Sequence, residues 1–353
     1  MDFLEDIKEF SSSRGFVDFG VSEAVVLEEE KEYLMEYLQA GFHGRMGYLE
    51  RNPDQRCDPS LLVDHAASIW IFLAPYSPAP RQTEFGRIAG YAQGVDYHPL
   101  IRQRLYEVLE RIRTHYPMTK GRAFTDSAPL LERAWAVRCG LGFIGRNGMF
   151  IHPEYGSRVL IGALVLDLPV KDLRPQQQPR PQQLQQLQQP QLEQLQQPQL
   201  QQLQQQQLQQ LQQHKPMGCG HCHLCLEHCP GQALVAPYRM DARKCIAYRT
   251  LEEPAMIKSQ IRREGLVVPE RTGEARPISG WLYGCDICQE VCPWNKKARQ
   301  AGWSEFSLYQ EALRQMRRED WERMTMTEFE ARFPDSPLLR CGLPNLVPTH
   351  PHK

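Results

Sequence analysis

The feature that most constrains this chain is a run of four cysteines followed directly by a proline: Cys219, Cys222, Cys225, Cys229 and Pro230. Two, two and three residues separate the cysteines. This is the spacing of bacterial ferredoxins, in which three thiolates hold one iron–sulfur cube and the fourth reaches a neighbouring cube. One such run therefore predicts a second set of ligands elsewhere in the chain.

The second set is present downstream, as Cys285, Cys288 and Cys292 before Pro293, with Cys245 upstream of them. Because the last cysteine of each run crosses over, ferredoxin topology predicts two sites of four thiolates. The first comprises Cys219, Cys222, Cys225 and Cys292, and the second Cys229, Cys245, Cys285 and Cys288. Structural zinc, which also uses Cys-x-x-Cys pairs, is the alternative. Three ligands on one tight loop favour a cube.

The other cysteines carry no such pattern. We expect Cys57 and Cys139 to be small core residues, and Cys341 has no partner in any motif. Three histidines lie among the ligands, and we expect surface or supporting roles for them: His221, His223 and His228.

Composition limits the class of protein. The chain has 353 residues, 41% of them apolar, which is enough for two domains with real cores. Its longest apolar run, 159–166, is too short to span a membrane, and the acidic N-terminus lacks a signal pattern. Eleven cysteines in motif spacing indicate a reducing compartment. We therefore expect a cytoplasmic protein without a membrane partner. The net charge of −1 neither demands nor excludes nucleic acid.

Hydrophobic periodicity predicts an α/β domain over residues 1–172. The expected helices are 1–10, 30–40, 99–112 and 129–139, and the expected strands are 68–76, 122–126, 143–151 and 158–166. Within residues 173–215, the stretch 176–213 is almost entirely Gln, Leu and Pro, and its four prolines interrupt any long helix. We expect a disordered linker there. It is followed by a ferredoxin-like module at 216–300 and a short helical tail at 301–353, with two short helices within 303–332.

Three stretches of the first domain are unusual for a plain scaffold: 91–98, 124–133 and 142–157. None of them fits a Gly-x-Gly-x-x-Gly motif or a P-loop, so a nucleotide cofactor is poorly supported. Asp126 stands at the end of an expected strand, just before an expected helix. It could be a helix N-cap or a catalytic carboxylate, and spacing alone does not decide between them.

These stretches and both cysteine runs resemble the epoxyqueuosine reductases, cobalamin-dependent iron–sulfur enzymes that complete queuosine in tRNA. The resemblance covers roughly 1–170 and 216–300. The matching residues are Tyr91, Ala92, Gly94, Asp96, Tyr97, His98, Thr125, Asp126, Ser127, Ala128, Pro129, Leu131, Glu132, Arg133, Gly140, Gly145, Arg146, Asn147 and the segment from Tyr283 to Asn295.

The resemblance implies a function. Cobalamin would lie between the N-terminal domain and the module with two 4Fe-4S clusters, which reduce its cobalt. The reduced cofactor would then drive removal of the epoxide oxygen from epoxyqueuosine at the wobble position of tRNA. Asp126 aligns with the family's proton donor, for which we expect a raised pKa. Arg56, Asn147 and Ser157 join Asp126 in stretches that match cofactor-contacting loops. An unidentified low-potential electron donor and a monomeric state are also expected.

The chain departs from the family pattern in three places. The Gln-rich segment enlarges the connection between the domains, and the tail is short, without the helical-repeat domain of many relatives. The stretch between Cys245 and Cys285 is longer than usual and carries basic residues, which predicts a solvated loop or a phosphate contact: Lys258, Arg262, Arg263, Arg271 and Arg276. Two other functions stay open, a dehalogenase-like corrinoid reductase and an electron carrier whose N-terminal domain docks partners.

Overall fold

The computed structural model describes residues 2–78, 86–126, 128–173, 217–265, 267 and 277–347. The expected linker at 173–215, apart from Leu173, lies outside the described residues, as do Arg271 and Arg276. Within the described parts of the chain, no helix is long and apolar enough to cross a membrane.

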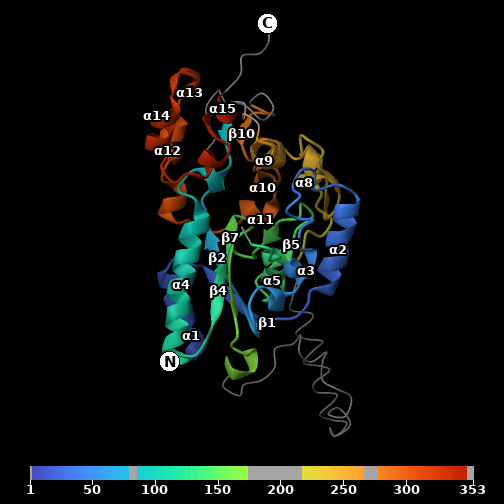
Figure 1. Cartoon of the computed structure of the whole chain (residues 1–353), viewed down its shortest axis with the longest axis vertical. Coiled ribbons are helices and arrows are strands. Elements are labelled where there is room, and N and C mark those ends of the chain that lie inside the picture. The colour runs from blue at the N-terminus through green and yellow to red at the C-terminus, as the bar shows by residue number, and fades with distance from the viewer. Residues whose placement is uncertain are drawn as a thin grey trace.

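The N-terminal domain is built on a four-stranded sheet with helices on both faces (Figure 1). Its strands run in the order β1 (Asp18–Glu23), β2 (Ser68–Pro75), β7 (Val159–Leu166) and β4 (Gly121–Phe124). All three pairings are antiparallel. Helices α1 (Phe3–Ser13) and α4 (Tyr97–His115) cover one face, and α2 (Glu28–Gln39), α3 (Pro53–Cys57) and α5 (Glu132–Arg138) lie on the other. Strands and helices alternate along the chain as expected, and the strands pair with one another in antiparallel fashion.

Strand β2 is buried along its whole length, which explains its continuous apolar run. Its side chains alternate between the two halves of the core. Trp70 and Phe72 pack beneath α1 and α4, whereas Ile69 and Ile71 pack beneath α5. Each such side chain contributes about 1.5–3 kcal/mol on burial, so this strand is the centre of the domain.

Helix α4 begins at Tyr97, two residues before the expected start at Pro99. The side chain of Asp96 caps it by accepting the His98 N–H at 2.9 Å. Farther along, the helix packs closely over β7, because a Cβ on Gly162 would lie only 2.8 Å from Cγ2 of Ile101. The cap and this close contact fix the position of Tyr97 and His98.

Two expectations for the middle of the domain are wrong in detail. The single strand expected at 143–151 is a hairpin of β5 (Phe143–Ile144) and β6 (Phe150–Ile151), because Gly148 turns the chain with φ +74°. Helix α5 begins at Glu132 rather than Pro129, with Leu131 in the N-cap position. Asp126 is therefore not a helix cap.

The cysteine-rich module packs directly on this domain. It contains α8 (Leu224–Glu227), β8 (Leu234–Ala236), β9 (Arg239–Met240), the π-helix η6 (Tyr248–Glu252), α9 (Glu253–Arg263), β10 (Trp281–Tyr283), α10 (Ile287–Glu290) and α11 (Pro293–Lys296). Strand β10 pairs in parallel with β3 (Arg87–Ile88) of the N-terminal domain. The buried carboxylate of Asp286 accepts the Gly90 N–H at 2.7 Å. Helix α9, which carries Lys258, Arg262 and Arg263, occupies part of the stretch expected to be a loop.

The tail forms a helical layer around a core of its own (Figure 1). It contains α12 (Gln310–Gln315), α13 (Arg318–Arg323), α14 (Met326–Arg332) and α15 (Leu343–Leu346), so the expectation of two helices within 303–332 is wrong. Elsewhere in the described parts of the chain, short helical turns occur as η1 (Pro59–Leu61), η2 (Gly90–Ala92), η3 (Val170–Leu173), η5 (Ala242–Lys244), η7 (Ser304–Ser307) and η8 (Pro337–Arg340). Amphipathic segments this short become helical through packing, which periodicity alone resolves poorly.

The C-terminal layer holds the loop that leads into α4. The Val95 N–H donates to the Glu305 carbonyl at 2.9 Å, and the Asp96 N–H donates to the Asp335 carbonyl at 2.5 Å. A Cβ on Gly94 would lie 2.0 Å from the same Glu305 carbonyl oxygen. The loop is thus packed too closely against the tail to carry a side chain at residue 94.

Candidate cluster sites and active site

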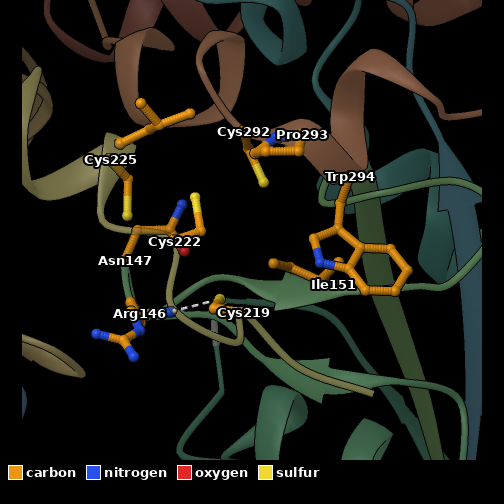
Figure 2. Close-up of a pocket in the computed structure, with 10 residues that line it drawn as sticks. Arg146, Asn147, Ile151, Cys219, Cys222, Cys225, Cys292, Pro293 and Trp294 are labelled. Carbon is orange, nitrogen blue, oxygen red and sulfur yellow. Dashed lines mark hydrogen bonds between the residues drawn. The ribbon is translucent and has the colours of Figure 1, made fainter. Parts of the chain in front are cut away.

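The four cysteines of the first expected set surround one cavity: Cys219, Cys222, Cys225 and Cys292. Its volume is about 130 Å³, and Ile151 and Trp294 form part of its wall. Figure 2 shows the four sulfur-bearing side chains around this cavity, three from the first cysteine run and one from the second. The structure thus brings together residues 73 positions apart in the way ferredoxin topology predicts.

The cysteines of the second set, all of them half-buried, lie close enough for their charges to act on one another. Burial, assisted by the negative charges of Cys245 and Cys229, raises the pKa of the Cys285 thiol to about 12. Burial and the charges of Cys285 and Cys245 likewise raise the pKa of Cys288. The cysteines that act on Cys285 and Cys288 through their charges all belong to the second expected set, and Asp286 acts on both as well.

The chemistry of both sets suits iron–sulfur clusters. Their donors are thiol sulfurs, and the sulfurs of the first set stand around a space. The Arg146 N–H donates to Cys219 Sγ at 3.4 Å, and the Ala233 N–H donates to Cys229 Sγ at 3.3 Å. Amide donors to ligand sulfur are one of the means by which proteins tune cluster potentials. Among the residues that the structure describes, no three His, Cys, Asp or Glu side chains are placed to hold a single metal ion.

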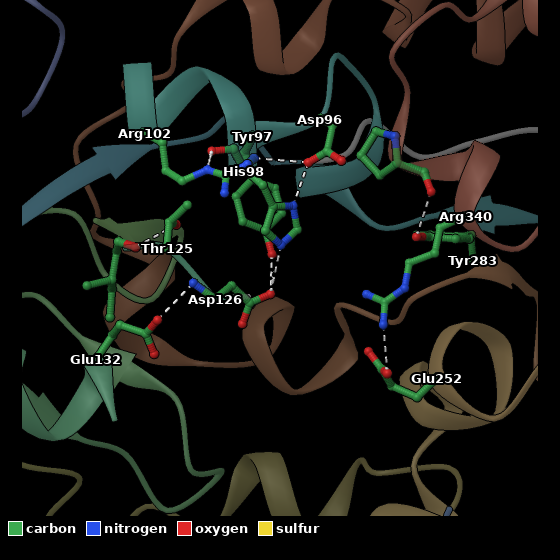
Figure 3. A network of polar contacts seen from close by, with 12 residues as sticks. Asp96, Tyr97, His98, Arg102, Thr125, Asp126, Glu132, Glu252, Tyr283 and Arg340 are labelled. Atoms are coloured by element: carbon green, nitrogen blue, oxygen red, sulfur yellow. Dashed lines mark hydrogen bonds and ion pairs between the residues drawn. The ribbon is translucent and has the colours of Figure 1, made fainter. Parts of the chain in front are cut away.

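Asp126 stands in a loop after β4, with its side chain 64% exposed. Its φ of +52° lies in the left-handed region, which is uncommon for a residue with a side chain. Tyr97 Oη donates to Oδ2 of Asp126 at 2.5 Å, and Nε2 of His98 lies 3.3 Å from the same oxygen (Figure 3). The Asp126 N–H donates to Oε1 of Glu132 at 2.8 Å. The carboxylate is therefore held on one side and open on the other.

The expectation of a raised pKa for Asp126 is wrong. The surrounding protein removes part of the hydration of this carboxylate, which alone would raise its pKa, but the hydrogen bonds from His98 and Tyr97 and the charge of His98 outweigh this effect and lower the pKa to about 2. His98 shows the complementary change. Burial opposes its charged form, but the hydrogen bonds to Asp126 and Asp96 prevail and raise its pKa to about 9. At neutral pH the proton shared by this pair consequently resides on His98.

A third carboxyl group supports the Asp126 loop. Burial and the negative charge of Asp126 raise the pKa of Glu132 to about 7. Its Oε1 nevertheless accepts the Asp126 N–H, so Glu132 is a positioning residue that stabilises the unusual backbone of Asp126.

The other expected cofactor residues lie apart from one another. Ser157 is buried, and its Oγ, 2.9 Å from both Gln289 Oε1 and Asn295 Nδ2, belongs to an internal network between domain and module. Asn147 is also buried. It lines the cavity of the first cysteine set, and its side chain hydrogen-bonds to Cys288 of the second.

Arg56 lies near enough to Glu132, the residue that supports the Asp126 loop, for the charge of Glu132 to act on it. Its Nη2 donates to the Tyr48 carbonyl at 2.7 Å, and its guanidinium lies 5.7 Å from the centre of the Tyr48 ring. The Nε of Arg56 is buried without a hydrogen-bond partner. A buried donor of this kind favours a ligand with acceptor oxygens, so Arg56 is the best supported of the three.

Sequence reasoning missed two charged residues beside Asp126, Glu252 at the end of η6 and Arg340 at the end of η8. Arg340 Nη2 lies 3.0 Å from Glu252 Oε2, and the charge of Asp126 acts on both residues. They are 88 residues apart, and no motif spans them. For Tyr97 and His98, by contrast, a signal existed in the polar and aromatic stretch 91–98.

Two family models match separate parts of the chain. The model described as "Epoxyqueuosine reductase QueG, DUF1730" matches residues 56–127, which include Arg56, Tyr97, His98 and Asp126. The model described as "4Fe-4S double cluster binding domain" matches residues 218–295, which contain all eight expected ligands. The second match identifies the cysteine-rich module as a double-cluster domain.

Curated relatives match along nearly the whole chain. The epoxyqueuosine reductase of Leadbetterella byssophila is 32% identical over 346 residues, covering 98% of this chain and 96% of the relative. That of Pseudomonas aeruginosa is also 32% identical over 346 residues, covering 96% of this chain and 81% of the relative. Similarity of this extent includes both domains and the tail.

Solved structures show the same fold. A selenomethionine-labelled epoxyqueuosine reductase matches with a TM-score of 0.72 at 24% identity, covering 98% of this chain and 79% of that one. An epoxyqueuosine reductase with a tRNA-Tyr epoxyqueuosine-modified stem loop matches with a TM-score of 0.71 at 24% identity, covering 98% and 78%. Together with the relatives at 32% identity, the shared fold leads to one conclusion: the chain belongs to the epoxyqueuosine reductase family and is an oxidoreductase.

Proposed function

We propose that this protein reduces epoxyqueuosine to queuosine in tRNA, with two 4Fe-4S clusters as electron carriers, cobalamin at the Asp126 site, and Asp126 with His98 as the proton source. The observation that carries the proposal is the carboxylate of Asp126. Tyr97 and His98 hold one side of it, and the other side is exposed. Such an arrangement suits proton delivery to a substrate oxygen.

The reaction requires two electrons and two protons. Both carbon–oxygen bonds of the epoxide break, a carbon–carbon double bond forms, and the oxygen leaves as water. Negative charge develops on that oxygen as the ring opens. Protonated His98 supplies the first proton through Asp126, and solvent at the exposed side of the site supplies the second. Tyr97 keeps the Asp126 carboxylate in position throughout.

The ligand sets of the two clusters are those expected from the sequence: Cys219, Cys222, Cys225 and Cys292 for the first, and Cys229, Cys245, Cys285 and Cys288 for the second. The loop at Gly220 and His221 of the first set is exposed, whereas Cys285 of the second packs against the same small cluster of buried residues as Tyr91. The Tyr91 ring lies 6.3 Å from that of Tyr97. Electrons therefore enter at the first cluster and leave from the second, which is nearer Asp126.

Cobalamin is the cofactor that the family resemblance implies. When bound, it supplies a reduced cobalt that delivers electrons to a substrate carbon. Arg56 would hold it, because the unpaired Nε of Arg56 can donate to the amide or phosphate oxygens of the cofactor. The side chains of Ser157 and Asn147 form hydrogen bonds with other residues of the protein, so we assign them a role in holding the cysteine-rich module in place.

The test uses the full chain reconstituted anaerobically with iron, sulfide and cobalamin. It is supplied with epoxyqueuosine-containing tRNA and a low-potential reductant, and nucleosides are measured by mass spectrometry. Queuosine should form. Asp126→Asn should lower turnover by about 10²–10⁴-fold while iron content and bound cobalamin stay unchanged. Absence of queuosine with the unmodified chain would refute the function, and full turnover by Asp126→Asn would refute the role of Asp126.

A matched control is Asp58→Asn. Asp58 is a half-buried aspartate of the same domain, and its side chain caps η1 by accepting the Ser60 N–H at 2.9 Å. Asn caps a helical turn about as well as Asp, and Asp58 does not contact His98, so its replacement should leave turnover unchanged.

A further inference from the structure

We propose that Glu252 and Arg340 form a substrate-positioning pair, in which Glu252 accepts a hydrogen bond from the secondary ammonium of the epoxyqueuosine side arm and Arg340 holds Glu252 in place. The inference rests on the proposed function, because it names the residues that receive the same substrate. It assigns a role to two segments that hold no expected cluster ligand. One is the end of η6, and the other is the tail.

The pair is well placed for this role. Arg340 Nη2 lies 3.0 Å from Glu252 Oε2, and the side chains keep 42% and 17% of their surface accessible. Figure 3 shows Asp126 between two groups, with Glu132 on one side and the Arg340–Glu252 pair on the other. Glu132 is committed to the Asp126 backbone. The pair is thus the charged neighbour of Asp126 that remains available to a ligand.

Both residues sit on segments tied to the Asp126 site. The turn that leads into Arg340 accepts the Asp96 N–H through the Asp335 carbonyl at 2.5 Å. Tyr283 Oη donates to the Pro337 carbonyl at 3.0 Å. Glu252 ends a π-helix that begins three residues after Cys245, and π-turns are frequent at functional sites.

A chain of aromatic contacts completes the connection between these segments. The Tyr283 ring lies 6.5 Å from that of Tyr91, which lies 6.3 Å from that of Tyr97. Tyr97 in turn donates to Asp126. The positions of Arg340 and Asp126 are therefore linked through packed, hydrogen-bonded groups and not only through the chain.

The chemistry of the substrate requires a cation near Asp126. The epoxide of epoxyqueuosine lies on a five-membered ring, and a secondary amine joins this ring to the base. That amine is protonated at neutral pH. When the epoxide oxygen lies at Asp126, the ammonium must lie only a few bonds away.

Glu252 is suited to receive that ammonium. Burial raises its pKa, Arg340 counteracts this, and the negative charge of Asp126 raises it again. A second cation would favour the ionised form. Asp96, the other nearby carboxylate, already accepts from His98.

The test measures binding of two anticodon stem-loops to the reconstituted full chain. One carries epoxyqueuosine at the wobble position, and the other carries guanine. Glu252→Gln should weaken binding of the epoxyqueuosine stem-loop about tenfold or more, as expected for loss of a hydrogen bond between charged groups. Binding of the guanine stem-loop should not change. In turnover, KM should rise while kcat changes little.

Arg340 variants check the supporting role. Arg340→Met should weaken binding of the epoxyqueuosine stem-loop selectively, and Arg340→Lys should restore part of it. The matched control is Arg314→Met, which breaks an exposed ion pair with Glu311 at 2.6 Å in the same C-terminal layer. It should leave both affinities unchanged.

Three outcomes would overturn the inference: unchanged binding in Glu252→Gln, an equal loss for both stem-loops, or a comparable loss in Arg314→Met. The last two would assign the effect to stability of the layer. Failure of the proposed function would look different, because the unmodified chain itself would then form no queuosine.

Discussion

The cysteine module and the Asp126 site are assembled in opposite ways. In the module, local spacing already groups most ligands, and folding adds Cys292 to the first set. The Asp126 site takes its groups from four distant segments: 96–98, 126–132, Glu252 and Arg340. The ligands of the module can thus be recognised from a sequence motif, whereas the groups of the Asp126 site come together only when the chain folds.

The pKa values of the two regions are also shifted by different causes. In the module, burial and like charges raise the pKa values of the thiols, so these cysteines release protons when a cluster binds them as thiolates. At Asp126, specific hydrogen bonds overcome burial and move the proton to His98. The pKa of the Asp126 carboxylate consequently lies below its usual value because of these two neighbours.

The largest expected effect tests the module. Cys288→Ala should remove one ligand of the second cluster, halve the bound iron, and abolish turnover, because the electron path would be cut next to the active site. Iron analysis and electron paramagnetic resonance measure the loss. Cys139→Ala, which alters a buried cysteine outside both sets, should keep all the iron. Full iron content in Cys288→Ala would contradict the assigned ligand set.

The next effect tests the proton on His98. For the unmodified protein, kcat/KM should fall as the pH rises through about 9, because His98 then loses its proton. His98→Asn should lower turnover about a hundredfold at neutral pH. It should also move this fall to lower pH, since Asp126 alone must then hold the proton. The measurement is the pH profile of kcat/KM.

The control for this profile is His65→Asn. His65 is an exposed residue with φ +59°, a conformation that Asn tolerates well. The profile should not move. If His98→Asn also kept the unmodified profile, the proton would not come from His98.

The smallest effect tests whether Ser157 is structural. Ser157→Ala should lower the free energy of unfolding by about 0.5–1.5 kcal/mol, because Gln289 Oε1 and Asn295 Nδ2 each lose one hydrogen bond and keep only those to Tyr76 and the Gln289 carbonyl. Turnover of the folded protein and its cobalamin content should stay the same. Denaturant titration measures the first and absorbance the second. Loss of cobalamin at unchanged stability would instead make Ser157 a cofactor contact.

Much of the N-terminal fold could be predicted from periodicity. A continuous apolar run predicts strand β2. The helical spacing of Ile101, Leu105 and Ile112 predicts the buried face of α4. The hairpin at 143–151 was missed because its turn depends on Gly148 alone. The antiparallel order of the sheet was also not predicted, since periodicity does not report which strands pair.

Only part of the candidate site could be predicted from the sequence. Asp126 stood out through its surrounding motif, but the partners that set its pKa lie 28 and 29 residues earlier. Helix α4 places them there only because Asp96 caps it and Gly162 lets it approach the sheet. Glu252 and Arg340 belong to segments without a recognisable pattern, so only tertiary packing reveals their contact.

The loop that precedes α4 has a consequence for synthesis of the protein. Residues 87–96 leave the ribosome early, yet their partners are Gly280, Tyr283, Glu305 and Asp335. Contacts across such long stretches of chain form late. A nascent N-terminal domain can therefore build its sheet but cannot finish its active site until translation has delivered the tail. Release of an incomplete chain would leave a folded N-terminal core with an incomplete and inactive site.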